Sequence, residues 1–489
     1  MINLLGNVVP MVFAILTIPL VIGTIGNEKF AVLTIAWLFL GYFSILDLGI
    51  GRATTKFVIE YHHKGLVNEV VELIYTSVLL LFFFGVMVGA ALYFMTPYIC
   101  DNFLNIPSYL KKETRESLRL IAGAIPFVIG VAGVRGVLEA HHQFRLLNII
   151  KIPSSVLNYL IPAITGLLVN SLTLIVFFLA LTRVILFIVY SYYCFKPLQH
   201  SGAFRKFNRS IINKLVSYGG WLTISNLIGP IMIYFDRFII GSVLTLTMLS
   251  YYTTPYEVIT KLLVVAGSAT GVLFPVFAKF FLHDKLKLTE IYSLALKGIV
   301  FIMLPVCLFF SFFSHEILSI WLGDLFAENS SMVLQLLCLG ILFNSIASIP
   351  YTSLQALNRP DIPAKIHLIE LPFYLAALTF FASRFGIQGV AFTWMIRNFI
   401  DAILFLLANN YFTYGKLAHG LRVFILLFLV LFFYFAASFI LSDSVNLLLK
   451  IPLFLSMLIF FILIFWFKVI SGIEKSTIQE FFKKQHESF

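Results

Sequence analysis

Ten charged side chains stand inside stretches of this sequence that are otherwise apolar. A charge placed at the centre of a bilayer costs roughly 2.5–3.5 kcal/mol on insertion scales, so it persists only where it is paired, titrates or faces water. A buried arginine suits an anionic ligand, and a buried carboxylate suits a proton or Na⁺. The ten residues are Asp47, Arg52, Arg183, Asp236, Arg237, Glu257, Lys261, Glu370, Arg397 and Asp401.

Spacing separates the charges that can neutralise a neighbour from those that cannot. Glu257 and Lys261 are four residues apart in the favoured order, and Arg397 and Asp401 have the reverse order. Both pairs are open to two interpretations, structural neutralisation or function. Asp236 and Arg237 are adjacent in "YFDRFIIG" and would point about 100° apart on a helix. Each needs another partner or water, either at an interfacial helix end or at a site.

Composition identifies the elements that must hold these charges. The chain has 489 residues, of which 60% are hydrophobic and 12% charged, and its mean hydropathy is +0.98. Soluble chains have about 45–50% apolar and about 25% charged residues, so this is an integral membrane protein. The net charge of +11 fits cationic loops on one side of a membrane better than nucleic-acid binding. The four cysteines have no metal spacing, and we expect neither a metal nor a cofactor.

The apolar stretches predict an all-α protein with about fourteen transmembrane helices, because about 20 apolar residues cross the hydrocarbon core. With an interior N-terminus, the inner connections hold 23 Lys and Arg residues and the outer ones hold 7. The positive-inside rule then places both termini in the cytoplasm. The expected spans are 4–25, 30–51, 70–96, 118–137, 152–169, 173–195, 215–241, 248–276, 293–314, 331–355, 366–383, 387–410, 422–441 and 451–469.

The sequence repeats itself weakly, with a nearly constant offset between the two copies. Leu138, Ala140 and Tyr159 recur as Leu354, Ala356 and Tyr374, and Arg183 recurs as Arg397. Six spans per copy give both copies one orientation, so we expect two parallel six-helix lobes with substrate bound between them. The predicted lobes are residues 1–205 (spans 1–6) and 206–415 (spans 7–12), and residues 416–489 hold two further helices and a tail.

Three stretches carry a resemblance to a known family. They are "IPLVIGTIGNEKFAVLTIAWLFLGYFSILDLGIGRATTKFV" (Ile18–Val58), "FDRFIIGSVLTLTMLSYYTTPYEVITKL" (Phe235–Leu262) and "SIPYTSLQALNRPDIPAKIHLIELPFYL" (Ser348–Leu375). Together they resemble the polysaccharide transporter family, the Wzx-type O-antigen and capsule oligosaccharide flippases. That family is part of the multidrug/oligosaccharidyl-lipid/polysaccharide exporter superfamily. The resemblance covers the whole chain, although its motifs are diffuse and hydrophobic.

The resemblance implies a flippase that moves undecaprenyl-diphosphate-linked oligosaccharide across the bacterial inner membrane by alternating access. It implies membrane lipids as surroundings, polysaccharide polymerase and chain-length proteins as further partners, and no nucleic acid. In the superfamily, spans one, two, seven and eight commonly line the central cavity. For the diphosphate, the candidate ligands are Arg237, Arg52, Arg397 and Lys261. For ion coupling, the candidate carboxylates are Asp236, Asp47 and Glu257.

Other functions remain open at this stage. A lipid II flippase and a multidrug or cation antiporter share the superfamily fold, and the stretches above favour the oligosaccharide branch over both. A membrane polymerase or ligase of polysaccharide is the alternative from another class. Enzymes of that kind commonly carry a large external loop, whereas the external connections here are short. We therefore expect a transporter without catalytic residues.

Overall fold

A computed structural model describes the protein over residues 2–43, 47, 49–141, 143–196, 211–213, 215, 232, 234–357, 359–414, 428, 431–432, 434–435 and 447–469. Throughout these residues the regular structure is helical. Nine of the described helices are long and apolar enough to cross a membrane. The expected class, an all-α protein with many membrane spans, is therefore confirmed, and fourteen is an approximate count. Expected spans 215–241 and 422–441 lie mostly outside the described residues.

The chain divides into two compact units. Unit 1 is Met1–Thr254 with Phe373–Ile387, and unit 2 is Pro255–Pro372 with Gln388–Phe489. The lobe boundaries expected after residues 205 and 415 fall outside the described residues and stay predictions.

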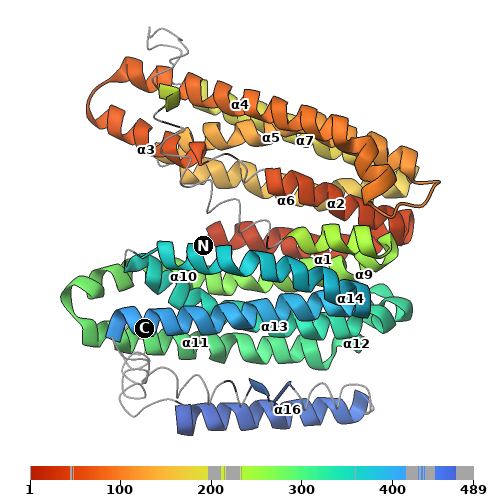
Figure 1. Cartoon of the computed structure of the whole chain (residues 1–489), viewed down its shortest axis with the longest axis vertical. Coiled ribbons are helices and arrows are strands. Elements are labelled where there is room, and N and C mark those ends of the chain that lie inside the picture. Colours follow the sequence, from red (N-terminus) through yellow and green to blue (C-terminus); the bar gives the residue numbers. More distant parts are fainter. Residues whose placement is uncertain are drawn as a thin grey trace, which may run out of the picture. The chain divides into compact units, whose positions relative to one another are not determined.

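Unit 1 is a helical bundle built around α5 (Figure 1). Its helix α5 packs against α4 and α7, and α1 packs against α6. Gly85 and Gly89 of α4 allow the close approach, because a Cβ at either would lie 2.6 Å or less from backbone atoms of α5. The elements are α1 (Ile2–Ile25), α2 (Asn27–Phe43), α3 (Ile50–His63), α4 (Val67–Tyr98), the π-helix Ile99–Phe103, α5 (Lys111–Ala140), α6 (Phe144–Val169), α7 (Leu172–Phe195), residues 234–243 and most of α9 (Leu246–Ile259).

Unit 2 is organised in the same way around α13, which packs against α10, α11 and α12 (Figure 1). Helix α16 is tied to α12 by an ion pair in which Lys450 Nζ lies 2.6 Å from Glu316 Oε1. The elements are the 3₁₀ turn Thr260–Leu262, α10 (Leu263–His283), α11 (Lys285–Phe312), α12 (Ser314–Leu322), α13 (Asp324–Ala356), α14 (Asp361–Tyr414) apart from its residues Phe373–Ile387, α16 (Leu447–Ile464) and the π-helix Phe465–Val469.

Helix ends and backbone angles support the internal repeat. Helix α5 ends at Ala140, and α13 ends at Ala356, the residue that the repeat pairs with Ala140. Asn170, between α6 and α7, has a positive φ of 45°, and Gly386, which the same offset pairs with it, has a φ of 59°. The apolar 18-residue segments of α5 and α13 are also the most buried among the candidate spans, at 67% and 78% of their residues. The two copies thus place their breaks and their central helix at equivalent positions.

One expected span is broken. The apolar pattern predicts a single helix over 30–51, but α2 ends at Phe43 and α3 begins at Ile50. Gly49 adopts a left-handed conformation with a φ of 66°. The Asp47 carboxylate accepts hydrogen bonds from the backbone N–H groups of Gly49 (3.0 Å) and Gly51 (3.1 Å). These bonds satisfy donors that a new helix leaves unpaired, which explains a charge in this apolar stretch.

Three cations in the first turns of α2 and α5, which the charge count assigns to the outer connections, are paired. Arg115 Nη2 lies 2.7 Å from Asp101 Oδ2, and Lys111 Nζ lies 3.8 Å from Asp101 Oδ1. Lys29 Nζ lies 3.2 Å from Glu113 Oε2 and donates to the backbone carbonyl of Asn170 at 2.9 Å. These contacts neutralise part of the positive charge at the start of the two helices.

Candidate functional site

In unit 1, Asp236 and Arg237 lie in the helical residues 234–243 and are buried. Asp236 is fully buried, and its carboxylate accepts a hydrogen bond of 2.6 Å from the Tyr252 hydroxyl. Arg237 is 2% exposed, and its guanidinium carbon lies 5.3 Å from the centre of the Tyr234 ring. The same helix packs on α2, where Phe238 meets Phe39 with ring centres 5.5 Å apart. In this conformation the pair belongs to a packed interior.

The other candidates of unit 1 lie at the start of α3. Asp47 caps the helix as described above, so a structural role accounts for its position. Arg52, in the first turn of α3, is exposed. Of the four cations predicted to bind the diphosphate, Arg52 is exposed in this conformation, and the other three are buried or half-buried.

Glu257 and Lys261 form the expected pair where α9 meets the 3₁₀ turn Thr260–Leu262. Lys261 Nζ lies 3.8 Å from Glu257 Oε2, and the side chains are 35% and 21% exposed, respectively. A short 3₁₀ segment inside a long helical stretch often marks a hinge. The pair is therefore partly solvated and lies beside a change in helical geometry.

Unit 2 also brings together four polar side chains of α14, which we call the α14 cluster: His367, Glu370, Arg397 and Asp401. Arg397 Nε lies 3.6 Å from Asp401 Oδ2, and His367 Nε2 lies 3.4 Å from Asp401 Oδ1. One ligand atom from each of His367, Glu370 and Asp401 lies within 4.8 Å of the other two. The arrangement gathers two carboxylates, an imidazole and a guanidinium in one place.

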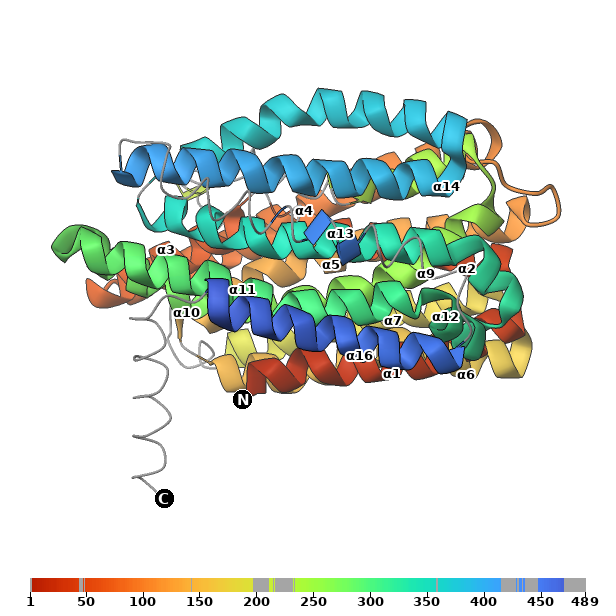
Figure 2. The ribbon, with the colours of Figure 1, turned by 90° about the horizontal axis from the view of Figure 1, so that it is seen from below.

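The break at Gly386 explains how one helix supplies both sides of the cluster. Gly386 has a φ of 59° and a ψ of −144°, so α14 consists of two helical arms (Figure 2). Glu370 and Asp401 lie on opposite sides of this glycine, at nearly equal separations along the sequence. At about 1.5 Å per residue, both lie roughly 22–24 Å from the break along their arms. The break at Gly386 therefore places the two carboxylates at similar distances along the two arms of α14.

Neighbouring groups hold Arg397 and His367 in place. Asn398 Oδ1 accepts hydrogen bonds from Asn344 Nδ2 of α13 (2.8 Å) and from Arg397 Nη2 (3.3 Å). The ring of Tyr351, also on α13, lies 6.4 Å from the His367 ring between centres. Asp401 is 4% exposed at its side chain and His367 is 25% exposed. The cluster is thus buried at Asp401 and accessible at His367.

Comparison with known proteins decides the family. Residues 1–281 match the family described as "Polysaccharide biosynthesis protein". The Shigella flexneri "Putative O-antigen transporter" is 33% identical over 402 residues, which cover 82% of this chain and 94% of that protein. This chain belongs to the polysaccharide biosynthesis protein family. The resemblance found in the three stretches of sequence is therefore confirmed.

Solved structures extend the likeness to the fold of this family member. The structure titled "Lipid II flippase MurJ, inward closed conformation" aligns with a TM-score of 0.71 at 15% identity, covering 96% of this chain and 99% of that chain. An inward-facing multidrug resistance MATE family transporter of the MOP superfamily gives 0.68 at 16% identity, covering 83% and 94%. At these identities the comparison establishes the shared fold.

The structure leaves the predicted roles of the seven candidate residues untested, but it shows which of them have partners. Arg397 is held by Asp401, and Lys261 by Glu257. The sequence-based prediction for this family member includes neither His367 nor Glu370 among the site residues. It notes Glu370 only as a charge within a span. The spacing between Glu370 and Asp401 forms no sequence motif. The one available signal is that both residues lie at similar distances from Gly386.

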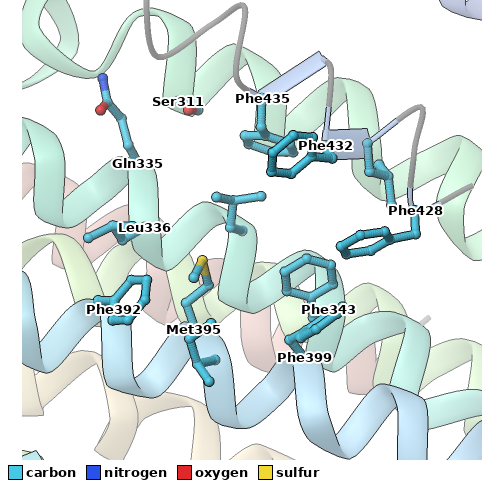
Figure 3. A pocket seen from close by; sticks show the side chains of 13 residues that line it. Ser311, Gln335, Leu336, Phe343, Phe392, Met395, Phe399, Phe428, Phe432 and Phe435 are labelled. Atoms are coloured by element: carbon cyan, nitrogen blue, oxygen red, sulfur yellow. The ribbon is translucent and has the colours of Figure 1, made fainter.

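An apolar cavity of about 500 Å³ also lies in unit 2 of this family member (Figure 3). Phenylalanine side chains from α13, α14 and residues 428–435 point into it, and Ser311 and Gln335 stand at one end. Such walls suit hydrocarbon and offer little to a sugar or a diphosphate. Its lining residues are Ser311, Gln335, Leu336, Leu339, Phe343, Phe392, Met395, Ile396, Phe399, Phe428, Leu431, Phe432 and Phe435.

Proposed function

We propose that this protein is a flippase that moves lipid-linked oligosaccharide units across the membrane by alternating access. The observation that carries the proposal is the 33% identity to the Shigella flexneri O-antigen transporter, because it extends over 94% of that protein. The MurJ-like fold supports the same conclusion, since a lipid-linked sugar is a substrate that this architecture can carry. The lipid II flippase and the multidrug transporter are supported by fold alone, at 15–16% identity.

The finer proposal concerns substrate and surroundings. The carrier is undecaprenyl diphosphate, the location is the bacterial inner membrane, and both termini are cytoplasmic. The excess of cations in the inner connections supports this orientation. Polysaccharide polymerase and chain-length proteins are the proposed partners. The repeat unit passes between the lobes of residues 1–205 and 206–415, and the protein performs no covalent chemistry.

Arg52 is the proposed first contact for the diphosphate. It is exposed in the first turn of α3, and a guanidinium binds phosphate oxygens through two parallel hydrogen bonds. Arg237 becomes a second ligand only if transport exposes it, because it is 2% exposed here. Lys261 and Arg397 bind phosphate only if they exchange their carboxylate partners for it. These observations rank Arg52 ahead of Arg237, the reverse of the order that the sequence suggests.

Reconstitution tests the function directly. Purified protein in liposomes is given undecaprenyl-diphosphate-linked oligosaccharide, and a membrane-impermeant enzyme that modifies the sugar reports its transfer between leaflets. We expect transfer above that of protein-free liposomes. Transfer of lipid II at the same rate, or no transfer of either lipid, would contradict the proposed substrate.

Variants then test the arginine. Arg52→Ala should reduce transfer about 10-fold or more, because charge-assisted bonds contribute roughly twice as much as neutral ones, and Arg52→Lys should restore only part of it. The matched control is Arg145→Ala, which removes another exposed arginine, at the start of α6. Equal transfer by Arg52→Ala and Arg145→Ala at matched protein levels would remove Arg52 from the site.

A further inference from the structure

We propose that the α14 cluster (His367, Glu370, Arg397 and Asp401) is a proton-binding site whose occupancy is coupled to transport. The coupling rests on the flippase function proposed above, whereas the binding of the proton does not. The sequence suggests Asp236, Asp47 and Glu257 for an ion, and none of these lies in this cluster.

The charge count of the cluster leaves room for one proton. Arg397 is a permanent cation, and its Nε lies 3.6 Å from Asp401 Oδ2. With Glu370 and Asp401 both ionised and His367 neutral, the cluster carries one net negative charge. A single proton makes it neutral, which is the state that a low-dielectric environment favours. Two carboxylates this close also repel each other, so one of them tends to hold a proton.

Hydrogen bonding gives a second reason. Both carboxylate oxygens of Glu370 are buried, and no permanent donor among the described residues gives either of them a hydrogen bond. An ionised carboxylate can only accept hydrogen bonds, so it would remain unsatisfied in that position. A protonated Glu370 has a donor, and its ligand atom already lies within 4.8 Å of the ligand atom of Asp401. The proton can therefore be shared between the two carboxyl groups.

The charged groups near the cluster on neighbouring elements are few. Across from the cluster, α13 contributes Tyr351, Asn344 and no charged group at this level. The charged residues of α13 are Asp324 and Glu328, in its first two turns and about 24 Å or more from Asn344 along the helix. Helix α9 also contacts α14, because the rings of Tyr256 and Trp394 lie 5.6 Å apart between centres, and its Glu257 is paired with Lys261.

The same residues favour a proton over a metal ion. Na⁺ prefers oxygen ligands, and the imidazole of His367 offers nitrogen. A divalent metal accepts both atom types, but it would approach the fixed positive charge of Arg397. A proton needs no coordination shell. His367 is 25% exposed and contacts Asp401, so it can receive the proton and pass it inward.

Infrared difference spectroscopy of the full-length protein in lipid nanodiscs tests the binding step without substrate. A protonated carboxyl group has a carbonyl-stretching band, and we expect that band to disappear as pH rises. Glu370→Gln should abolish the titrating band and Asp401→Asn should shift it. The control Glu290→Gln makes the same change at an exposed position on α11 and should leave the band intact. A band unchanged in Glu370→Gln would overturn the proposal.

The same titration distinguishes ions. It is run in potassium buffer, in sodium buffer and with Zn²⁺. Identical titrations support a proton alone, whereas a shift caused by Na⁺ or Zn²⁺ would show a metal site and overturn the assignment. Folding of each variant is checked by its melting curve.

Liposomes with a proton gradient test the coupling. For wild type and Glu290→Gln, transfer of the lipid-linked oligosaccharide should respond to the gradient. Coupling between sites commonly changes affinity about 5- to 150-fold, so a response in that range is expected, and it should be absent in Glu370→Gln. An equal response in Glu370→Gln would overturn the coupling. Absence of transfer by wild type would refute the proposed function and leave the infrared result standing.

Discussion

Two regions of this molecule bury opposite charges in apolar helices, and they do so differently. Asp236 of unit 1 is fully buried and accepts hydrogen bonds of 2.6 Å from Tyr252 and 2.7 Å from the backbone N–H of Arg237. In the α14 cluster of unit 2, the ion-pair distances are 3.4 and 3.6 Å, and Glu370 has buried oxygens without a described donor. Short bonds fix a charge in one state. Longer contacts leave room for a proton to arrive and depart.

The largest effect should come from removing the cation of the α14 cluster. Arg397→Ala leaves two carboxylates without their counterion, and breaking a buried pair from one side costs about 3–5 kcal/mol of the free energy of unfolding. The double variant Arg397→Ala/Asp401→Asn should recover part of that loss, because one uncompensated charge is gone. Denaturant unfolding in detergent measures both. Additive losses in the double variant would show that the two side chains do not interact.

A smaller effect is expected in unit 1. Tyr252→Phe removes one hydrogen bond to the Asp236 carboxylate, and such a bond to a charged group contributes about 1.5–3 kcal/mol. The matched control is Tyr411→Phe, because Tyr411 is 59% exposed. The same unfolding measurement applies. If Tyr252→Phe were as stable as the control, the short bond would not be what fixes Asp236, and the contrast between the two regions would fail.

The smallest effect should be at the partly exposed pair. Glu257→Gln breaks the 3.8 Å contact with Lys261, whose side chain is 35% exposed. Solvent-exposed pairs contribute about 0–1 kcal/mol, so the melting temperature should change little. Transport is the informative measurement, since Glu257 is one of the carboxylates that the sequence suggests for ion coupling. A lost response to a proton gradient in Glu257→Gln would move the coupling site from the α14 cluster to α9.

The sequence by itself determined the membrane class, the helical architecture, the repeat and the family. Each depends on a signal that is local or repeated along the chain. Apolar runs of about 20 residues specify spans whatever they pack against. The constant offset of the repeat predicted that features of one copy recur in the other, as the positive φ angles of Asn170 and Gly386 do. The expected spans 366–383 and 387–410 likewise correspond to the two arms of α14, because the apolar pattern pauses at the turn.

Only the tertiary structure decided which charges have partners. The sequence suggests Asp47 for ion coupling, and only the structure shows that its carboxylate binds the backbone N–H groups at the start of α3, beside a break at Gly49 that the apolar pattern does not reveal. Tyr252 of α9 binds Asp236, which lies 16 residues earlier, on the preceding helical segment 234–243. Glu370 and Asp401 are distant in the sequence, and their proximity depends on how α14 folds at Gly386. Spacing along a chain fixes neighbours within one helix, whereas partners on different helices depend on packing.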